Sequence, residues 1–241
     1  MKKIILMLML IMSCFNLSAQ NEIVRRSTKA KQSSKTTTSQ NNKTHHPNTT
    51  THKIFNYIPE HAIDLGLPSG TLWSDRNLGA STESDYGNYF AYGDVKPERY
   101  IGFSKESNYP NKNIVRSNMD AATYYLGGEW HMPTCNQAKE LVKFCKWKET
   151  KIGDKYGYKI TGPNGNSIFL PSAGWLMFPG GQKEPDYGDQ GSRGNYWCGE
   201  VNHKEKEGNA YQIYFATDGH SWHYVTTELR WMYNTIRPVW D

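Results

Sequence analysis

Gly and Pro interrupt residues 58–241 every few positions, and this spacing limits what the segment can fold into. Aromatic side chains, mostly Tyr and Trp, lie between the interruptions. Neither Gly nor Pro suits the interior of a helix or of a central strand, so long elements are disfavoured. The pattern predicts one domain of short strands and ordered loops, long enough to bury a substantial core.

Residues 62–73 and 158–170 each contain two short apolar runs separated by a turn sequence. The first turn, residues 67–70, holds Pro and Gly in turn-forming places. The second turn contains Asn164-Gly165, a strong hairpin signal. Both segments are therefore predicted to form β-hairpins.

Two segments carry helical signals. One helix is predicted from about Asp120 to Leu126, because Gly127-Gly128 follows it and suits a helix C-terminus. The other opens at Pro133-Thr134, where Thr134 and Gln137 are spaced as a capping box. Apolar residues then recur at helical spacing on one predicted buried stripe, formed by Ala138, Leu141, Val142 and Cys145.

Residues 211–216 alternate as a half-buried strand should, with Tyr211, Ile213 and Phe215 on one face. Residues 235–240 predict a closing strand, whose Pro suits an edge or a strand end. Two helices among many short antiparallel strands predict an α+β fold.

The N-terminus predicts export. Positive residues at the start precede an apolar run, Ile4–Met12, which is too short to span a bilayer. Small residues then lead to Ala19 and Gln20, so residues 1–20 are interpreted as a signal peptide. Cleavage before Cys14, as in a lipoprotein, is the alternative, and no later stretch reaches membrane-spanning length.

Residues 21–57 are rich in Ser, Thr, Asn, Gln and Lys and hold few apolar side chains, so we expect a disordered polar linker. The chain's positive excess lies in residues 1–53. The remainder carries more acidic than basic side chains, which argues against a nucleic-acid partner.

Cysteine usage does not indicate a disulfide scaffold. Removal of the signal peptide leaves Cys135, Cys145 and Cys198, an odd number. Cys135 and Cys145 are about 15 Å apart along the predicted helix, beyond the reach of a disulfide. A bond between Cys198 and one of them stays open.

Catalytic signatures are missing from the sequence, which has no Gly-x-Ser-x-Gly elbow, no His-Glu-x-x-His motif and no phosphate-binding loop. Asp186 and Asp189 could serve a glycosidase, but they are interpreted as exposed loop carboxylates. Cys198 stands alone and is interpreted as a core cysteine.

Metal and cofactor sites are weakly indicated, and none is predicted. His220 and His223 are ligand-type residues, yet their spacing on a strand need not bring them together. Glu184-Pro185-Asp186 is similar to a calcium and sugar motif but lacks its amide and a partner motif.

The sequence Gly127-Gly128-Glu129-Trp130-His131-Met132-Pro133-Thr134 and several other ordered blocks of residues 60–240 resemble the Fibrobacter succinogenes major paralogous domain family. Gly127–Thr134 resembles its central Gly-Gly-x-Trp-Arg-Met-Pro-Thr signature, with His131 in place of Arg and, later in the chain, Cys198 in place of Ser. The resemblance covers roughly residues 60–240. Its other blocks are residues 62–73, 77–80, 89–94, 157–159, 170–174, 196–197 and 236–239.

This resemblance implies a C-type-lectin-like α+β fold in residues 58–241, in a secreted or cell-surface protein of the Bacteroidetes type. The role of the family is largely unassigned. The related fold also occurs in adhesins, in formylglycine-generating oxidases and in variable proteins of diversity-generating retroelements, so the fold does not choose the function.

Aromatic residues divide into two groups. Trp73, Trp130 and Trp197 lie in the family blocks and are predicted core. A second group lies outside them and carries polar tips and Arg, the side chains favoured at recognition surfaces. It is the predicted ligand-binding set, with a partly buried loop that holds its own sheet edge as the alternative: Asp218, Trp222, His223, Tyr224, Arg230, Trp231, Tyr233 and Asn234.

The sequence thus predicts an extracellular, non-catalytic binding or adhesion module for a glycan or a protein. No cofactor, nucleic acid or membrane span is expected. An enzyme of the lectin-like oxidase or glycan-acting kind is the second hypothesis. A retroelement-diversified display protein is the third.

Overall fold

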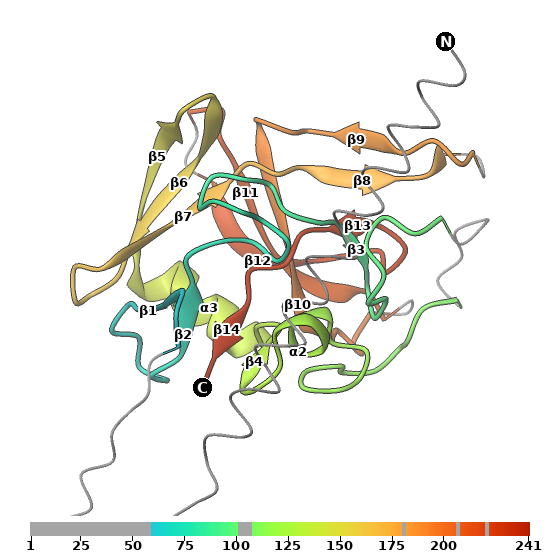
Figure 1. Ribbon diagram of the computed structural model, residues 1–241, viewed down its shortest axis with the longest axis horizontal. Helices are drawn as coiled ribbons and strands as arrows, with labels where there is room; N and C mark the ends of the chain where they lie inside the picture. Colours follow the sequence, from blue (N-terminus) through green and yellow to red (C-terminus); the bar gives the residue numbers. More distant parts are fainter. Residues whose placement is uncertain (1–58, 101–107, 180–181, 206–207, 220–221) are drawn as a thin grey trace, which may run out of the picture. The chain divides into compact units, whose positions relative to one another are not determined.

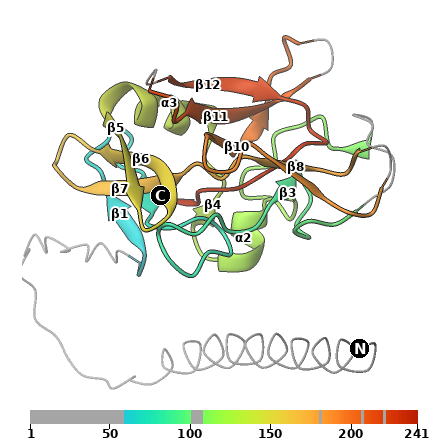
Figure 2. The same ribbon diagram turned by 90° about the horizontal axis from the view of Figure 1, so that it is seen from above.

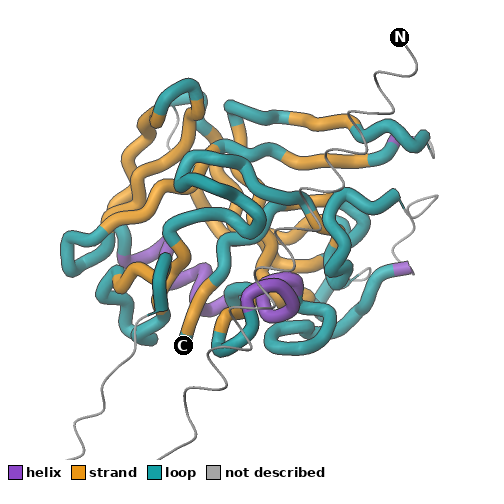
Figure 3. The backbone as a smooth tube through the Cα atoms, viewed as in Figure 1, coloured by secondary structure: helices purple, strands orange, loops and turns teal. Residues whose placement is uncertain are grey.

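The computed structural model describes residues 59–100, 108–179, 182–205, 208–219 and 222–241. The predicted signal peptide and polar linker lie outside these ranges. Asn56–Asp241 form one compact unit, whose described part consists of short strands, two α-helices and many loops (Figures 1 and 3). The predicted α+β class is confirmed, with antiparallel sheets predominating. None of the helices in these ranges is long and apolar enough to cross a membrane.

The described strands form four sheets, in each of which successive strands are hydrogen-bonded neighbours. The first contains β1 (Ala62–Asp64), β2 (Leu72–Ser74), β14 (Val239–Trp240) and β4 (Trp130–His131). The second contains β3 (Phe90–Ala91), β13 (Tyr233–Asn234), β8 (Trp175–Met177) and β9 (Asp186–Gly188). The third contains β5 (Lys146–Ile152), β6 (Lys155–Thr161) and β7 (Ser167–Pro171). The fourth contains β10 (Arg193–Val201), β11 (Ala210–Ala216) and β12 (His223–Glu228).

Both predicted hairpins are confirmed. β1 pairs with β2 and β6 pairs with β7, each antiparallel. In the second turn Gly165 has a φ of 91°, a backbone conformation that a side chain would strain. The closing strand is shorter than predicted, because β14 begins only after Pro238 and β13 is a separate short strand.

The two predicted helices are confirmed as α2 (Ala121–Leu126) and α3 (Cys135–Phe144). The Asp120 side chain accepts a hydrogen bond from the Thr123 N–H at the start of α2, and Gly127 ends the helix. Thr134 and Gln137 form the predicted capping box of α3. The buried stripe of α3 faces the largest core cluster, through Ala138 and Leu141.

The core holds the predicted tryptophans. Trp73 and Trp197 are fully buried, and Trp130 is 8% exposed. Cys198 is a buried core cysteine as predicted, and the structure has Cys135, Cys145 and Cys198 as free thiols.

A charged side chain lies at the centre of this core. Arg237 is fully buried, and its guanidinium donates to Asn77 Oδ1 at 2.9 Å, to the Ser74 carbonyl at 3.0 Å and to the Phe169 carbonyl at 2.7 Å. Burial lowers the pKa of Arg237 to about 10, which still leaves it charged at neutral pH. Arg237 therefore ties β2, β7 and the terminal segment together.

Candidate binding surface

The structure separates the predicted ligand-binding set. Trp222 is 58% exposed and Tyr224 is 44% exposed, and Asp218 also lies at the surface. His223 and Trp231 are half-buried. Three members are buried in the domain, namely Arg230, Tyr233 and Asn234.

The three buried members hold the structure together. Arg230 donates to the Tyr109 carbonyl at 2.6 Å, and the Tyr233 hydroxyl donates to the Arg99 carbonyl at 2.7 Å. The Asn234 amide donates to Gln212 Oε1 at 3.0 Å. These residues are not available to a surface ligand, so the alternative of a partly buried loop describes these three of the eight residues.

His223 points to the opposite face of its strand from Trp222 and Tyr224, as strand alternation requires. Its ring stacks on Trp147 with centroids 4.5 Å apart and an interplanar angle of 10°. Both rings pack beside Tyr158 and Phe215 of the main core cluster. The His223 side chain therefore lies on the core-facing side of the sheet, away from Trp222 and Tyr224.

The register of β10, β11 and β12 brings half-buried Tyr214 together with exposed aromatic side chains of β12 and its preceding residue. Tyr214 lies opposite Tyr224, and their ring centroids are 5.3 Å apart. The Ala216 N–H donates to the Trp222 carbonyl at 3.1 Å, which places Trp222 beside Ala216 on the same face. Arg193 of β10 lies opposite Ala216 on the other side. We call Arg193, Tyr214, Trp222 and Tyr224 the aromatic face.

Polar groups line one side of the aromatic face. Arg193 Nη1 donates to Asp189 Oδ2 at 3.0 Å, and Trp175 Nε1 donates to the same oxygen at 2.9 Å. The Arg193 side chain is 50% exposed, and this single bond leaves its other N–H groups to solvent or a ligand. Burial raises the pKa of Tyr214, so its phenol stays a neutral hydrogen-bonding group.

Sequence reasoning missed Arg193 and Tyr214 as surface partners. It places Tyr214 only on an alternating strand and Asp189 only in an exposed loop. The alternation of residues 211–216 already puts Tyr214 on the face away from Ile213 and Phe215. The alternation pattern does not show which strand lies beside Tyr214.

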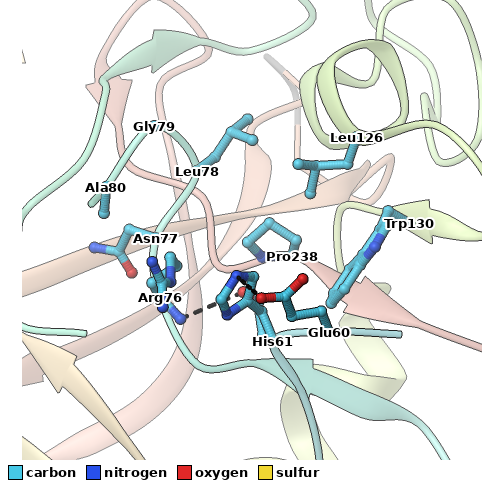
Figure 4. Close-up of a pocket in the computed structure, with 11 residues that line it drawn as sticks. Glu60, His61, Arg76, Asn77, Leu78, Gly79, Ala80, Leu126, Trp130 and Pro238 are labelled. Carbon is cyan, nitrogen blue, oxygen red and sulfur yellow. Dashed lines mark hydrogen bonds and ion pairs between the residues drawn. The ribbon is translucent and has the colours of Figure 1, made fainter. Parts of the chain in front are cut away.

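A small pocket forms a second concave feature (Figure 4). Apolar side chains face charged ones across it, and its cavity volume is about 190 Å³. That volume is below the roughly 300–1,000 Å³ of typical small-molecule sites, so it fits a group the size of one side chain. Its main lining residues are Leu78, Leu126, Trp130 and Pro238 on one side and Glu60, His61 and Arg76 on the other.

The charged side of this pocket is internally paired. His61, whose φ is 72°, lies 3.1 Å from Asp75 through Nδ1, and Arg76 Nε donates to Asp75 at 2.8 Å. Burial alone would raise the pKa of Asp75, but hydrogen bonds from Arg76 and His61 lower it overall. The charges of this pocket therefore stabilise one another, and its walls offer mainly apolar contact.

A third polar cluster surrounds His131. His131 Nδ1 lies 2.7 Å from the Met132 carbonyl, and Nε2 lies 2.9 Å from Asp241 Oδ1. Both ring nitrogens of the buried imidazole therefore have a polar neighbour within hydrogen-bond distance. Asp241 also accepts from Arg116 and Gln137. The side chains of this cluster bind one another, so we assign the cluster a structural role.

Cys198, the cysteine considered for the oxidase hypothesis, is buried. Burial raises the pKa of the Cys198 thiol, which keeps it in its protonated, unreactive form. Among the described residues, no three His, Cys, Asp or Glu side chains gather as metal ligands. His220 lies outside the described residues, so its position relative to His223 does too.

The aromatic face is thus the strongest candidate for a ligand, on the geometry of its own side chains. Comparison of the chain with protein-family models, with curated proteins and with solved structures finds no match.

Proposed function

We propose that this chain is an extracellular, non-catalytic binding or adhesion module, and that its ligand lies on the aromatic face. One observation carries the proposal. Trp222, Tyr224 and Tyr214 share one face of a rigid sheet, beside an arginine with unused donors. Such side chains bury large areas at low entropic cost, which is why Trp, Tyr and Arg dominate binding hot spots.

A glycan chain is the ligand that this surface fits best. A sugar ring has an apolar face of C–H groups, which can stack on Trp222 or Tyr224, and a rim of hydroxyl groups. The hydroxyls would meet donors and acceptors from Arg193, Asp189 and Tyr214. The face is open rather than enclosed, which suits an extended polymer more than a small metabolite.

Export and fold family belong to the same proposal. The N-terminal signal features support secretion or surface display. The ordered blocks between residues 60 and 240 support the major paralogous domain family and its C-type-lectin-like fold. The mainly antiparallel α+β architecture is compatible with both.

A panel of polymeric glycans and extracellular proteins, immobilised and probed with the purified chain, tests the proposal. Trp222→Ala and Tyr224→Ala should each weaken the binding found by at least about 30-fold, the loss expected for a hot spot. Tyr124→Ala is the matched control, because Tyr124 is 62% exposed but lies on α2. Full binding by both variants, with loss in Leu126→Ser, would move the site to the small pocket.

A further inference from the structure

β12 is an edge strand. The fourth sheet has the order β10–β11–β12, so β12 is hydrogen-bonded to β11 on one side only. In Figure 2 it is the outermost strand of this sheet. An edge strand presents unpaired backbone N–H and C=O groups to any strand that reaches it.

The hydrogen-bond alternation identifies the outward groups of β12. The Ala216 N–H donates to the Trp222 carbonyl, so Trp222 and every second residue after it bond toward β11. The backbone groups of Val225 and Thr227 therefore point away from the sheet. Within the described part of the chain, no hydrogen bond occupies the N–H or C=O of these two residues.

Two other edge strands carry features that oppose pairing with a second chain, and β12 carries neither of these features. β5, the edge of the third sheet, carries Lys146, Lys148 and Lys151, all exposed. Lysines on an edge strand oppose pairing with another chain. β9 is only three residues long and directly follows Pro185. β12 has neither Lys nor Pro, and its centre is the β-branched run 225–227.

We propose that two copies of this chain join through their β12 edges into one continuous antiparallel sheet. The register that uses Val225 and Thr227 of both copies places Thr226 opposite Thr226 of the partner subunit. Val225 then pairs with Thr227 of the partner subunit, which forms four N–H···O bonds. Tyr224 lies opposite the partner's Glu228, so no like charges oppose each other.

The two-fold axis of such a pair is perpendicular to the sheet, so both aromatic faces point the same way. A polymeric ligand could then contact two aromatic faces at once, and avidity would raise the apparent affinity. The pairing itself depends only on the backbone edge. It therefore stands or falls separately from the ligand.

Sedimentation of the purified chain over a concentration series tests the pairing. We expect a concentration-dependent dimer that Val225→Pro weakens at least about tenfold, because the proline removes an outward N–H from each copy. Val225→Thr keeps the N–H and should keep the dimer. Thr226→Glu, which places two carboxylates opposite each other, gives an independent test should the proline disturb folding.

Cross-linking tests the register. In a Cys145→Ser background, Thr226→Cys should form an intersubunit disulfide with oxidised glutathione as the electron acceptor, because opposed residues of this kind are about 4.5 Å apart at Cα. Thr150→Cys on the lysine-bearing β5 should not. A chain that stays monomeric at all concentrations, or a dimer unchanged by both Val225→Pro and Thr226→Glu, overturns the proposal. So does occupation of the β12 edge by a different protein.

Discussion

Two halves of one sheet face differ in what covers them. On β11, Gln212 and Tyr214 point to the same face, two residues apart. Gln212 is 2% exposed, whereas Tyr214 is half-buried beside exposed Tyr224 and Trp222. We call the first the closed half, which also holds Trp197, and the second the open half.

The C-terminal residues that follow β12 cover the closed half and leave the open half at the surface. The Trp197 N–H donates to the Thr235 carbonyl, and the Asn234 amide reaches Gln212. Asn195 also donates to Gln212 Oε1, at 3.1 Å. These bonds from residues 234 and 235 cover the closed half. An aromatic or polar side chain thus becomes core or binding surface according to a segment far away in the sequence.

The largest difference in stability loss is expected between a buried arginine and an arginine of the open half. Arg237→Leu leaves three acceptors without a donor, and we expect a loss of about 5 kcal/mol in unfolding free energy. Arg193→Leu removes an exposed arginine of the open half and should change stability by less than about 0.5 kcal/mol. Urea unfolding measures both. Equal losses would remove the distinction between core and surface arginine.

The two halves offer a matched tryptophan pair. Trp197→Ala should cost about 3–5 kcal/mol, because the fully buried ring also donates to the Phe90 carbonyl. Trp222→Ala should cost less than about 1 kcal/mol, since that ring is 58% exposed. Thermal unfolding followed by circular dichroism compares them. A large loss for Trp222 would place it in the core and withdraw it from the aromatic face.

Polar replacement should have a smaller effect on the closed half. Gln212→Leu leaves the amides of Asn195 and Asn234 without their shared acceptor, at a cost of about 1–3 kcal/mol. Thr226→Ala, on the neighbouring strand, is the control and should stay within about 0.5 kcal/mol. If chemical denaturation gives the two variants the same midpoint, the amide network contributes nothing to the closed half.

The weakest effect is a change with pH, and it should appear in stability rather than in ligand binding. Burial would raise the pKa of Asp241, but His131 and Arg116 lower it overall. A carboxyl group whose pKa is lowered by folding stabilises the fold at pH values above its ordinary pKa, which is near 3.8. This stabilisation is lost as the pH falls through the lowered pKa of the folded state. Because the carboxyl is partly exposed, the loss should be under about 1 kcal/mol.

Asp241→Asn isolates this contribution. Unfolding midpoints of the variant and the parent chain, measured between pH 7 and about pH 3, should converge in acid. An unchanged difference across this range would show that the Asp241 carboxylate does not stabilise the fold through its charge.

Local features were predictable from the sequence because neighbouring residues determine them. The Asn164-Gly165 turn, the Thr134–Gln137 capping box and the Gly127 helix end each depend on backbone angles and bonds within a few positions. The core tryptophans were predicted from the blocks that resemble a known family, in which all three lie. These features led to the α+β class.

The candidate site was only half predictable. The sequence by itself brought Trp222 and Tyr224 forward as recognition side chains, together with Arg230, Tyr233 and Asn234. All five lie in one segment outside the family-like blocks, and that segment is rich in the polar-tipped aromatics and Arg favoured at recognition surfaces. Only the tertiary structure buried the last three and added Arg193 and Tyr214 to the surface. Strand alternation assigns a side chain to one of two faces, but which face is covered depends on segments that return from far along the chain. Burial is a property of those distant contacts, and no local pattern records it.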